Sequence, residues 1–210
     1  MFDDYVKMIC ERIKSLLEMN DRVLVAIDGN CGAGKSTLGR KIAELLEANL
    51  FHMDDFYLTP ELRTKARMQE VGGNVDYVRF KAEIIEGVNK GKPFEFRPFN
   101  CKLQDFCQPK YVLPKKVNIV EGSYSLHPTL IEFYDLKIFI EISPEIQEKR
   151  ILKRNGPIMF EKFKSLWIPL ENLYFETLGI KEKCDLILKQ GDGSLFANPR
   201  LPLAKQLLLG

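Results

Sequence analysis

The sequence predicts a three-layer α/β fold with a parallel five-stranded sheet. Five short apolar runs rich in β-branched residues are separated by segments of helical periodicity, which is the pattern of a parallel sheet covered by helices. A glycine-rich loop follows the first run and opens a helix. The 210 residues contain no internal repeat and no low-complexity linker, so we expect one domain over residues 1–210.

Composition narrows the classes of function. The 31 basic and 29 acidic residues give a net charge of +2 without a long block of either sign, so nucleic acid is not an expected partner. Apolar runs are too short to span a membrane, and the N-terminus carries acids where a signal peptide carries lysines. Five scattered cysteines without C-x-x-C spacing indicate neither a disulfide framework nor a zinc site. We therefore expect a cytoplasmic protein without a membrane partner, and its oligomeric state, a homo-oligomer included, stays open.

Helical and extended segments alternate through the first half of the chain. Apolar residues recur at helical spacing over residues 5–18, a strand covers residues 23–27, and a helix follows the glycine-rich loop to about residue 48. A second strand is expected over residues 50–53 and a helix over residues 77–89. Residues 93–114 alternate aromatic, proline and polar residues, which indicates a β-hairpin outside the main sheet.

The second half continues the alternation. Further strands are expected over residues 117–120, 136–142 and 185–188. Ser143-Pro144-Glu145 is a strong helix start, and Asn155-Gly156-Pro157 is expected to end that helix. An aromatic stripe on the next helical segment is expected to lie in the core, and Pro169 to bend or break the segment. The stripe consists of Phe160, Phe163 and Trp167.

The glycine-rich loop indicates the chemistry. Residues 29–36 fit G-x-x-x-x-G-K-[ST], after a strand and before a helix, a context that a chance match in a glycine-rich turn lacks. Glycines let successive backbone N–H groups point at phosphate oxygens, and the helix N-terminus favours the same anion. Lys35 can then reach the β- and γ-phosphates, and the Ser36 hydroxyl can ligate Mg²⁺. The residues expected to bind ATP are Gly29, Asn30, Cys31, Gly32, Ala33, Gly34, Lys35, Ser36 and Thr37.

Cys31 has two interpretations within this loop. Its thiol could be sensitive to oxidation, or the residue could be there because it is small enough to fit. We prefer the second.

Acidic residues follow two of the predicted strands. Asp54 and Asp55 come directly after residues 50–53, and Glu121 follows residues 117–120. Because ligands bind beyond the carboxyl ends of parallel strands, these carboxylates are expected to face the γ-phosphate. Asp54 or Asp55 could accept the proton of an attacking hydroxyl, and Glu121 could hold Mg²⁺. The alternatives are an exposed turn or helix cap for the pair, and an ordinary surface position for Glu121.

Other charged residues have two interpretations each. Arg150 and Arg154 share a helix face, from which they could fold over the phosphates as part of a lid over about residues 150–170, or compensate the helix dipole. Asp76 could cap the helix that follows it or hold a pair of sugar hydroxyls. The alternating Arg63, Lys65 and Arg67 are expected on a solvated face rather than as ligands.

Together these motifs resemble the uridine kinase and phosphoribulokinase branch of the P-loop kinases. The resemblance covers residues 23 to about 188. The matching motifs are residues 29–37, Asp54-Asp55-Phe56-Tyr57, Asn74-Val75-Asp76, residues 120–124 and the arginines before Asn155.

The resemblance implies a P-loop NTPase fold and a role for each matching residue. It makes Asp54 the base, Asp76 a ligand of ribose hydroxyls, and Ser36 and Glu121, with Asp54, the Mg²⁺ ligands. It implies a helical lid that carries Arg150 and Arg154. Where uridine kinases place a Tyr-Asp pair and a histidine in the hairpin, this sequence has Phe99-Asn100 and Gln104. The residues expected to bind the acceptor are therefore Asp54, Tyr57, Asp76, Phe99 and Gln104.

We therefore expect an ATP- and Mg²⁺-dependent kinase of a small-molecule alcohol, with the 5′-hydroxyl of uridine or cytidine as the first choice of acceptor. Lys35, Asp54, Arg150 and Arg154 are the expected catalytic residues. Another metabolite alcohol, as in pantothenate kinase or phosphoribulokinase, is the nearest alternative. A nucleotide-binding switch without turnover is a further one. A nucleoside monophosphate kinase is disfavoured, because its phosphate acceptor is already ionised and needs no base.

Overall fold

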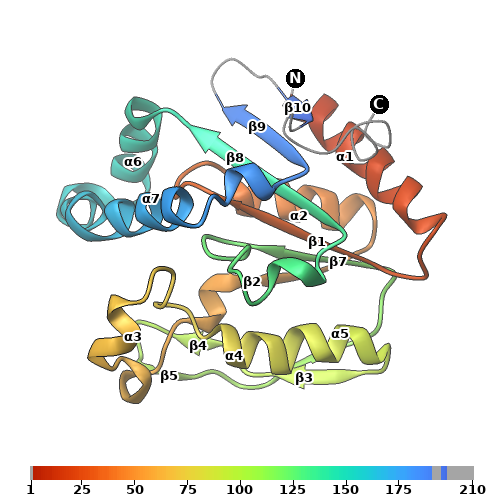
Figure 1. Ribbon diagram of the computed structural model, residues 1–210, viewed down its shortest axis with the longest axis horizontal. Helices are drawn as coiled ribbons and strands as arrows, with labels where there is room; N and C mark the ends of the chain where they lie inside the picture. The colour runs from red at the N-terminus through yellow and green to blue at the C-terminus, as the bar shows by residue number, and fades with distance from the viewer. Residues whose placement is uncertain (1, 191–194, 198–210) are drawn as a thin grey trace.

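The main sheet has five parallel strands and one antiparallel edge strand. The computed structural model describes residues 2–190 and 195–197, and the strand order is β10-β9-β8-β1-β7-β2 (Figure 1). Neighbours from β9 to β2 pair in parallel, and β10 pairs antiparallel with β9. The strands are β1 (Val23–Gly29), β2 (Asn49–His52), β7 (Val117–Glu121), β8 (Leu136–Ile142), β9 (Leu186–Gln190) and β10 (Leu195–Ala197). The expected five-stranded parallel sheet is confirmed, and β10 is an addition that the sequence did not indicate.

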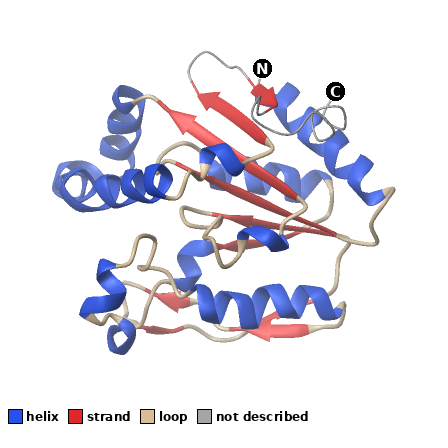
Figure 2. Cartoon of the chain, in the orientation of Figure 1, coloured by secondary structure: helices blue, strands red, loops and turns tan. Residues whose placement is uncertain are grey.

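Helices cover both faces of this sheet (Figure 2). The longer ones are α1 (Phe2–Leu17), α2 (Lys35–Leu45), α6 (Pro144–Lys162) and α7 (Ile168–Thr177). A continuous helix consists of α4 (Tyr77–Phe80), a π-helical turn (Lys81–Ile85) and α5 (Glu86–Lys90). A short helix α3 (Lys65–Gln69) precedes it. Within the described residues, none of these helices is both long enough and apolar enough to cross a bilayer.

The alternation of side chains along β1 produces the two cores. Val23, Val25 and Ile27 pack on one face against α1 and α2, whereas Leu24 and Ala26 face the other core. Successive side chains of a strand point to opposite faces, so a strand buried on both sides is apolar at every position. The second core includes side chains of α4, α5 and α7. The three-layer arrangement is therefore confirmed.

The segment after β8 differs from its prediction in two places. Gly156, with φ 75° and ψ 171°, breaks the helical backbone where the sequence predicted the end of the helix. The expectation that the aromatic stripe lies wholly in the core is wrong, because Phe163 and Trp167 line a pocket and Trp167 is 36% exposed. Pro169 was expected to bend or break the segment, and it does not break it. A π-helical turn (Phe163–Trp167) leads directly into α7, whose first turn accommodates the proline.

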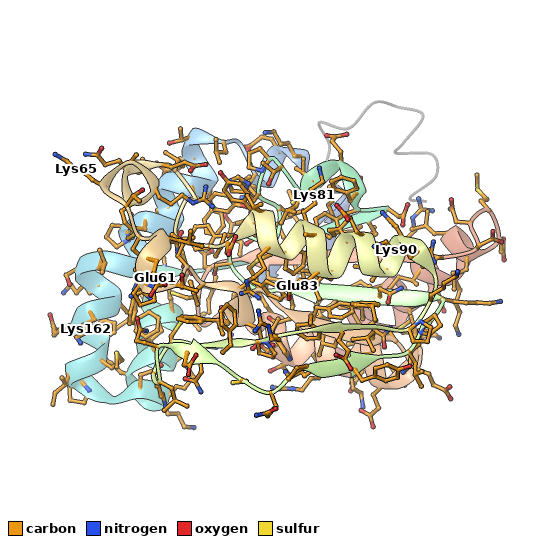
Figure 3. The ribbon with its side chains drawn as sticks, turned by 90° about the horizontal axis from the view of Figure 1, so that it is seen from below. Glu61, Lys65, Lys81, Glu83, Lys90 and Lys162 are labelled. Carbon is orange, nitrogen blue, oxygen red and sulfur yellow. The ribbon has the colours of Figure 1, made fainter. Side chains whose placement is uncertain are left out.

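A hairpin region packs beside the helix that begins at Tyr77. Its antiparallel pairs are β3 (Phe94–Phe96) with β6 (Lys110–Val112), and β4 (Phe99–Asn100) with β5 (Asp105–Phe106). Arg79 donates from its guanidinium to the carbonyl oxygens of Arg97 (2.8 Å) and Asp55 (3.1 Å). Glu83, which Figure 3 shows on the same helix, accepts from the Arg97 N–H at 3.2 Å. These bonds connect the helix, the hairpin region and the segment after β2.

His127 is a buried neutral histidine. Its ring is 3% exposed and stacks on Tyr77 with centroids 4.1 Å apart, and its Nδ1 accepts from the Thr129 N–H at 3.3 Å. Burial lowers the pKa of His127 from 6.5 to about 4. Because the unfolded chain binds this proton at a higher pH than the folded chain, His127 destabilises the fold as pH falls from 6.5 to 4.

His127→Asn can keep a hydrogen-bond acceptor near the Nδ1 position, but its side chain does not titrate in this range. We expect the unfolding free energy of this variant to depend less on pH between 6.5 and 4. Between pH 6.5 and 4, the wild type should lose on the order of 2 kcal/mol more unfolding free energy than the variant. Urea denaturation at a series of pH values measures the difference. Parallel profiles for the two proteins would contradict the assignment.

Candidate active site

A pocket of about 1120 Å³ lies beyond the carboxyl ends of the parallel strands, between the α6–α7 region and the segments around α3 and the β4–β5 turn (Figure 1). This is where an open parallel sheet binds its ligands. The predicted site residues that line it are Cys31, Gly32, Gly34, Lys35, Ser36, Thr37, Asp54, Tyr57, Gln104, Glu121, Arg150 and Arg154. Gly29, Asn30, Ala33, Asp76 and Phe99 do not line it.

Two glycines allow the phosphate loop to form. A Cβ atom at Gly29 would lie 2.1 Å from the carbonyl oxygen of Ile140, so a side chain there would force β1 and β8 apart. Gly34 has φ 99° and immediately precedes α2, in a backbone region that L-residues rarely adopt. The loop therefore turns from β1 into the N-terminus of α2, where N–H groups without intrahelical partners can bind an anion.

The ammonium group of Lys35 lies against the loop backbone. Its Nζ donates to the carbonyl oxygens of Gly29 (2.6 Å) and Asn30 (3.0 Å) and to the hydroxyl of Ser123 (3.1 Å). Lys35 is also buried, which places its charge in a medium where it attracts anions more strongly than in water. A phosphate in this pocket would meet a cation that the loop already holds in position.

Glu171, on α7, holds the same loop from the other side of the pocket. Its carboxylate accepts from the Cys31 N–H at 2.9 Å and from the Ser123 hydroxyl at 2.5 Å, and the residue is only 5% exposed. Ser123 connects this carboxylate to Lys35. The Cys31 N–H already has an acceptor, so a phosphate needs to bind only the other N–H groups of the loop.

Ser36 and Glu121 form a set of oxygen ligands at the pocket floor. The Ser36 hydroxyl donates to Glu121 Oε2 at 3.0 Å, and the other oxygen of Glu121 pairs with His52. Glu121 raises the pKa of His52 through this pair. Within the described residues, no three His, Cys, Asp or Glu side chains are grouped closely enough to hold a metal by themselves. The donors fit Mg²⁺, which usually takes one or two protein ligands and completes its shell with water and substrate phosphates.

The two adjacent acids after β2 have different surroundings. Asp54 lines the pocket and accepts from the Tyr57 hydroxyl at 3.3 Å. Asp55 does not line the pocket; its carboxylate pairs with Lys110 of the hairpin region at 3.2 Å. Desolvation by the pocket walls raises the pKa of Asp54, and Lys35 opposes this increase. Of the two acids, only Asp54 can therefore contact a ligand bound in the pocket.

The helix α6 contributes three side chains near the phosphate loop. Gln147 donates to the Cys31 carbonyl oxygen at 3.0 Å, and Arg150 donates to that of Gly32 at 3.1 Å. Arg154 lines the pocket and donates to the side chain of Asn155 at 2.7 Å. Both arginines thus lie in the pocket rather than only at a helix end.

Two residues expected to bind the acceptor have structural partners. Asp76 caps α4 by accepting from the Arg79 N–H at 3.0 Å, and it lies 3.5 Å from the Arg79 guanidinium. Asp76 therefore caps the helix, and its binding of sugar hydroxyls stays a prediction. Phe99 is 4% exposed and packs edge-to-face on Phe106.

Cys31 has a poorly reactive thiol. Burial and the nearby carboxylate of Glu171 raise its pKa to about 12, so almost no thiolate is present at neutral pH. This agrees with its interpretation as a small residue that fits the loop.

Known proteins resemble this chain in sequence and in fold. A uridine kinase of Staphylococcus epidermidis is 24% identical over 85% of this chain and 93% of its own length. A pantothenate kinase of Bacillus subtilis is 27% identical over 81% of this chain and 68% of its own length. A phosphoribulokinase of Synechocystis is 25% identical over 60% of this chain and 39% of its own length. No model of a known protein family matches the sequence.

The chain resembles uridine kinases and phosphoribulokinases. A structure described as a possible uridine kinase from Bacillus stearothermophilus has a TM-score of 0.60 at 17% identity, covering 84% of this chain and 97% of that one. The protein YGR205w has a TM-score of 0.62 at 16% identity, covering 94% and 98%. These structures confirm the P-loop kinase fold, and the names of the sequence relatives support a kinase.

Several residues of this site were missed in the sequence. Glu171 lies three residues before Tyr174, and both side chains pack toward the phosphate loop and β1. Apolar residues three and four positions away on either side of Glu171 were the available signal, because a charge on a buried helix face needs a partner. His52 precedes the acidic pair directly, but its contact with Glu121 depends on the pairing of β2 with β7. Gln147 carried no comparable signal.

We expect Glu171→Leu to lose about 3 kcal/mol of unfolding free energy, because the Cys31 N–H and the Ser123 hydroxyl are left without their acceptor. Glu171→Gln should lose only about 1 kcal/mol, since an amide can accept from one group and donate to the other. Urea denaturation of both variants measures the contrast. Equal losses would contradict this expectation, because they would show that the amide replaces the carboxylate no better than an apolar side chain does.

Proposed function

We propose that the protein transfers the γ-phosphoryl group of ATP to an alcohol of a small molecule, with Mg²⁺ as the metal. The observation that carries this proposal is the presence of Asp54 in the same pocket as the phosphate loop, Lys35 and the Ser36–Glu121 pair. A protein that only binds a nucleotide needs no carboxylate facing the phosphates. A kinase of an alcohol needs one, because the hydroxyl must lose its proton.

Each side chain has a distinct task in this proposal. The loop N–H groups and Lys35 bind and orient the phosphates, while Ser36, Glu121 and Asp54 provide oxygen ligands for the metal. Bound Mg²⁺ would neutralise charge on the phosphate oxygens. Asp54 accepts the proton of the acceptor hydroxyl, because its carboxylate lines the pocket that also contains the phosphate loop. Arg150 and Arg154 contribute positive charge from the α6 wall.

The sequence relatives suggest several alcohols that could receive the phosphoryl group. The relatives named uridine kinase suggest a nucleoside 5′-hydroxyl, and those named phosphoribulokinase or pantothenate kinase suggest other alcohols. Tyr57 and Gln104 line the pocket, as binding of a nucleoside would require, whereas Asp76 and Phe99 do not. Release of ADP from Mg-ATP should therefore be measured with uridine, cytidine, pantothenate, ribulose 5-phosphate and simpler alcohols, with Lys35→Ala as the blank.

We expect Asp54→Asn to lower acceptor-dependent turnover by at least about 100-fold, because an amide cannot accept the hydroxyl proton. ATP affinity should change little, since the phosphate loop is intact. Asp55→Asn is the matched control: it removes the same charge one residue along, breaks an exposed pair with Lys110, and should leave turnover within about twofold.

Steady-state kinetics and calorimetric titration with ATP measure both quantities. Equal losses for Asp54→Asn and Asp55→Asn would contradict the role of Asp54. ATP binding without acceptor-dependent release of ADP in the wild type would favour a nucleotide-binding switch.

A further inference from the structure

Arg63 lies on one wall of the pocket, and the proposed mechanism does not use it. We define the acceptor wall as the pocket-lining residues of segments 54–74 and 101–104. They are Asp54, Tyr57, Leu58, Arg63, Met68, Asn74, Cys101 and Gln104. These segments include the region around α3 and the β4–β5 turn, whereas other lining residues come from α6 and α7. Figure 1 shows α3 and β4 below the main sheet, and α6 and α7 above them. Arg63 is exposed, as expected, and it also lines the pocket in which the proposed acceptor would bind.

The guanidinium group of Arg63 has one hydrogen bond to the backbone and is open to solvent. Its Nε donates to the carbonyl oxygen of Leu58 at 3.2 Å, and the residue is exposed. Its charge helps to lower the pKa of Glu61, which is exposed and does not line the pocket. Among the residues that the structure describes, no carboxylate forms an ion pair with Arg63. By contrast, Arg67 pairs with Glu70 at 2.7 Å and Arg79 lies 3.5 Å from Asp76.

The charge of Arg63 reaches the part of the pocket that Asp54 also faces. Both side chains act on the thiol of Cys101: burial raises the pKa of Cys101, Arg63 lowers it, and Asp54 raises it. The charges of Arg63 and Asp54 therefore both reach Cys101, and all three residues line the same pocket.

The rest of the acceptor wall does not balance this cation. Apart from Asp54, which the proposed mechanism uses as base, its members are uncharged, and Leu58 and Met68 are apolar. When a bound acceptor displaces water, a guanidinium without an anion loses hydration that nothing replaces. An anionic acceptor removes this penalty, and a carboxylate or phosphate matches the planar fork of an arginine.

We propose that the acceptor carries an anionic group, a carboxylate or a phosphate, in addition to the hydroxyl that receives the phosphoryl group, and that Arg63 binds this anion. The proposal rests on the proposed kinase function and specifies its substrate class. It agrees with the position of Asp76 and Phe99, because two groups expected to read a neutral nucleoside lie outside the pocket.

The test compares matched alcohols that differ only in the anion. Glycerol is paired with glycerate and with glycerol 3-phosphate, ribose with ribose 5-phosphate, and pantothenol with pantothenate; uridine is the neutral nucleoside. The proteins are the wild type, Arg63→Gln and Arg63→Lys. Lys65→Gln is the control, because it removes an equal charge from an exposed side chain that Figure 3 shows at the outer edge of the molecule. Initial rates of ADP release give kcat and KM for each pair.

In the wild type, the anionic member of at least one pair should have a kcat/KM at least about tenfold above that of its neutral partner. Arg63→Gln should remove this preference mainly through KM, Arg63→Lys should keep part of it, and Lys65→Gln should keep all of it. The neutral partner should change by less than about twofold in every variant. Preference for carboxylates over phosphates, or the reverse, identifies which anion is bound.

Three results would overturn the proposal: turnover of uridine or another neutral alcohol that exceeds that of every anionic one, an equal effect of Arg63→Gln on both members of a pair, or an equal effect of Lys65→Gln. If no alcohol stimulates ADP release, the proposed function fails separately. Calorimetric binding of the same pairs to the protein with ADP and Mg²⁺ then decides the role of Arg63. If the wild type binds an anionic member and Arg63→Gln does not, the anion site is supported. If the wild type binds no anionic member, or if Arg63→Gln binds it equally well, the anion site is overturned.

Discussion

Two buried carboxylates hold the phosphate loop in shape, and the site depends on them. Asp28, at the end of β1, accepts from the N–H groups of Gly29 (2.7 Å) and Leu126 (3.0 Å) and from the Tyr174 hydroxyl (2.9 Å). Glu171 accepts from Cys31 and Ser123. Burial raises the pKa of Asp28 to about 6, which shows the electrostatic cost of keeping a carboxylate there. Because Glu171 and Tyr174 are three residues apart on α7, one face of a distant helix contacts both Asp28 of β1 and Cys31 of the loop.

Contacts with residues far away in the chain also give the two acids after β2 different surroundings. They lie in a 3₁₀-helical turn (Met53–Phe56), where adjacent side chains point in different directions. Asp55 meets Lys110 of the hairpin region, and Asp54 is left facing the pocket. A pairing 55 residues away in the chain thus determines which of the two acids can act as a base.

Local signals predicted the sheet and the phosphate loop because each depends on a short stretch of sequence. Apolar runs marked the five strands, and Gly29 to Ser36 marked the loop, whose geometry needs residues without side chains. The remaining site residues depend on contacts that no short stretch encodes. Glu171 accepts from the N–H of Cys31, 140 residues away in the chain, and His52 contacts Glu121 only because β2 pairs with β7. Arg63 looked like its neighbours Lys65 and Arg67, and only the folded chain places it in the pocket.

The contacts of Lys35 also explain how it could bind a phosphate. Its ammonium group donates to two carbonyl oxygens and to Ser123, so the buried charge is hydrogen-bonded. A phosphate offers charged oxygens, to which an ammonium bonds about twice as strongly as to neutral acceptors. Lys35 can therefore exchange partners without a rearrangement of the backbone, since Asp28 and Glu171 keep the loop in place through contacts that a phosphate does not replace. Binding energy that would otherwise order the loop is then available to position the phosphate for transfer.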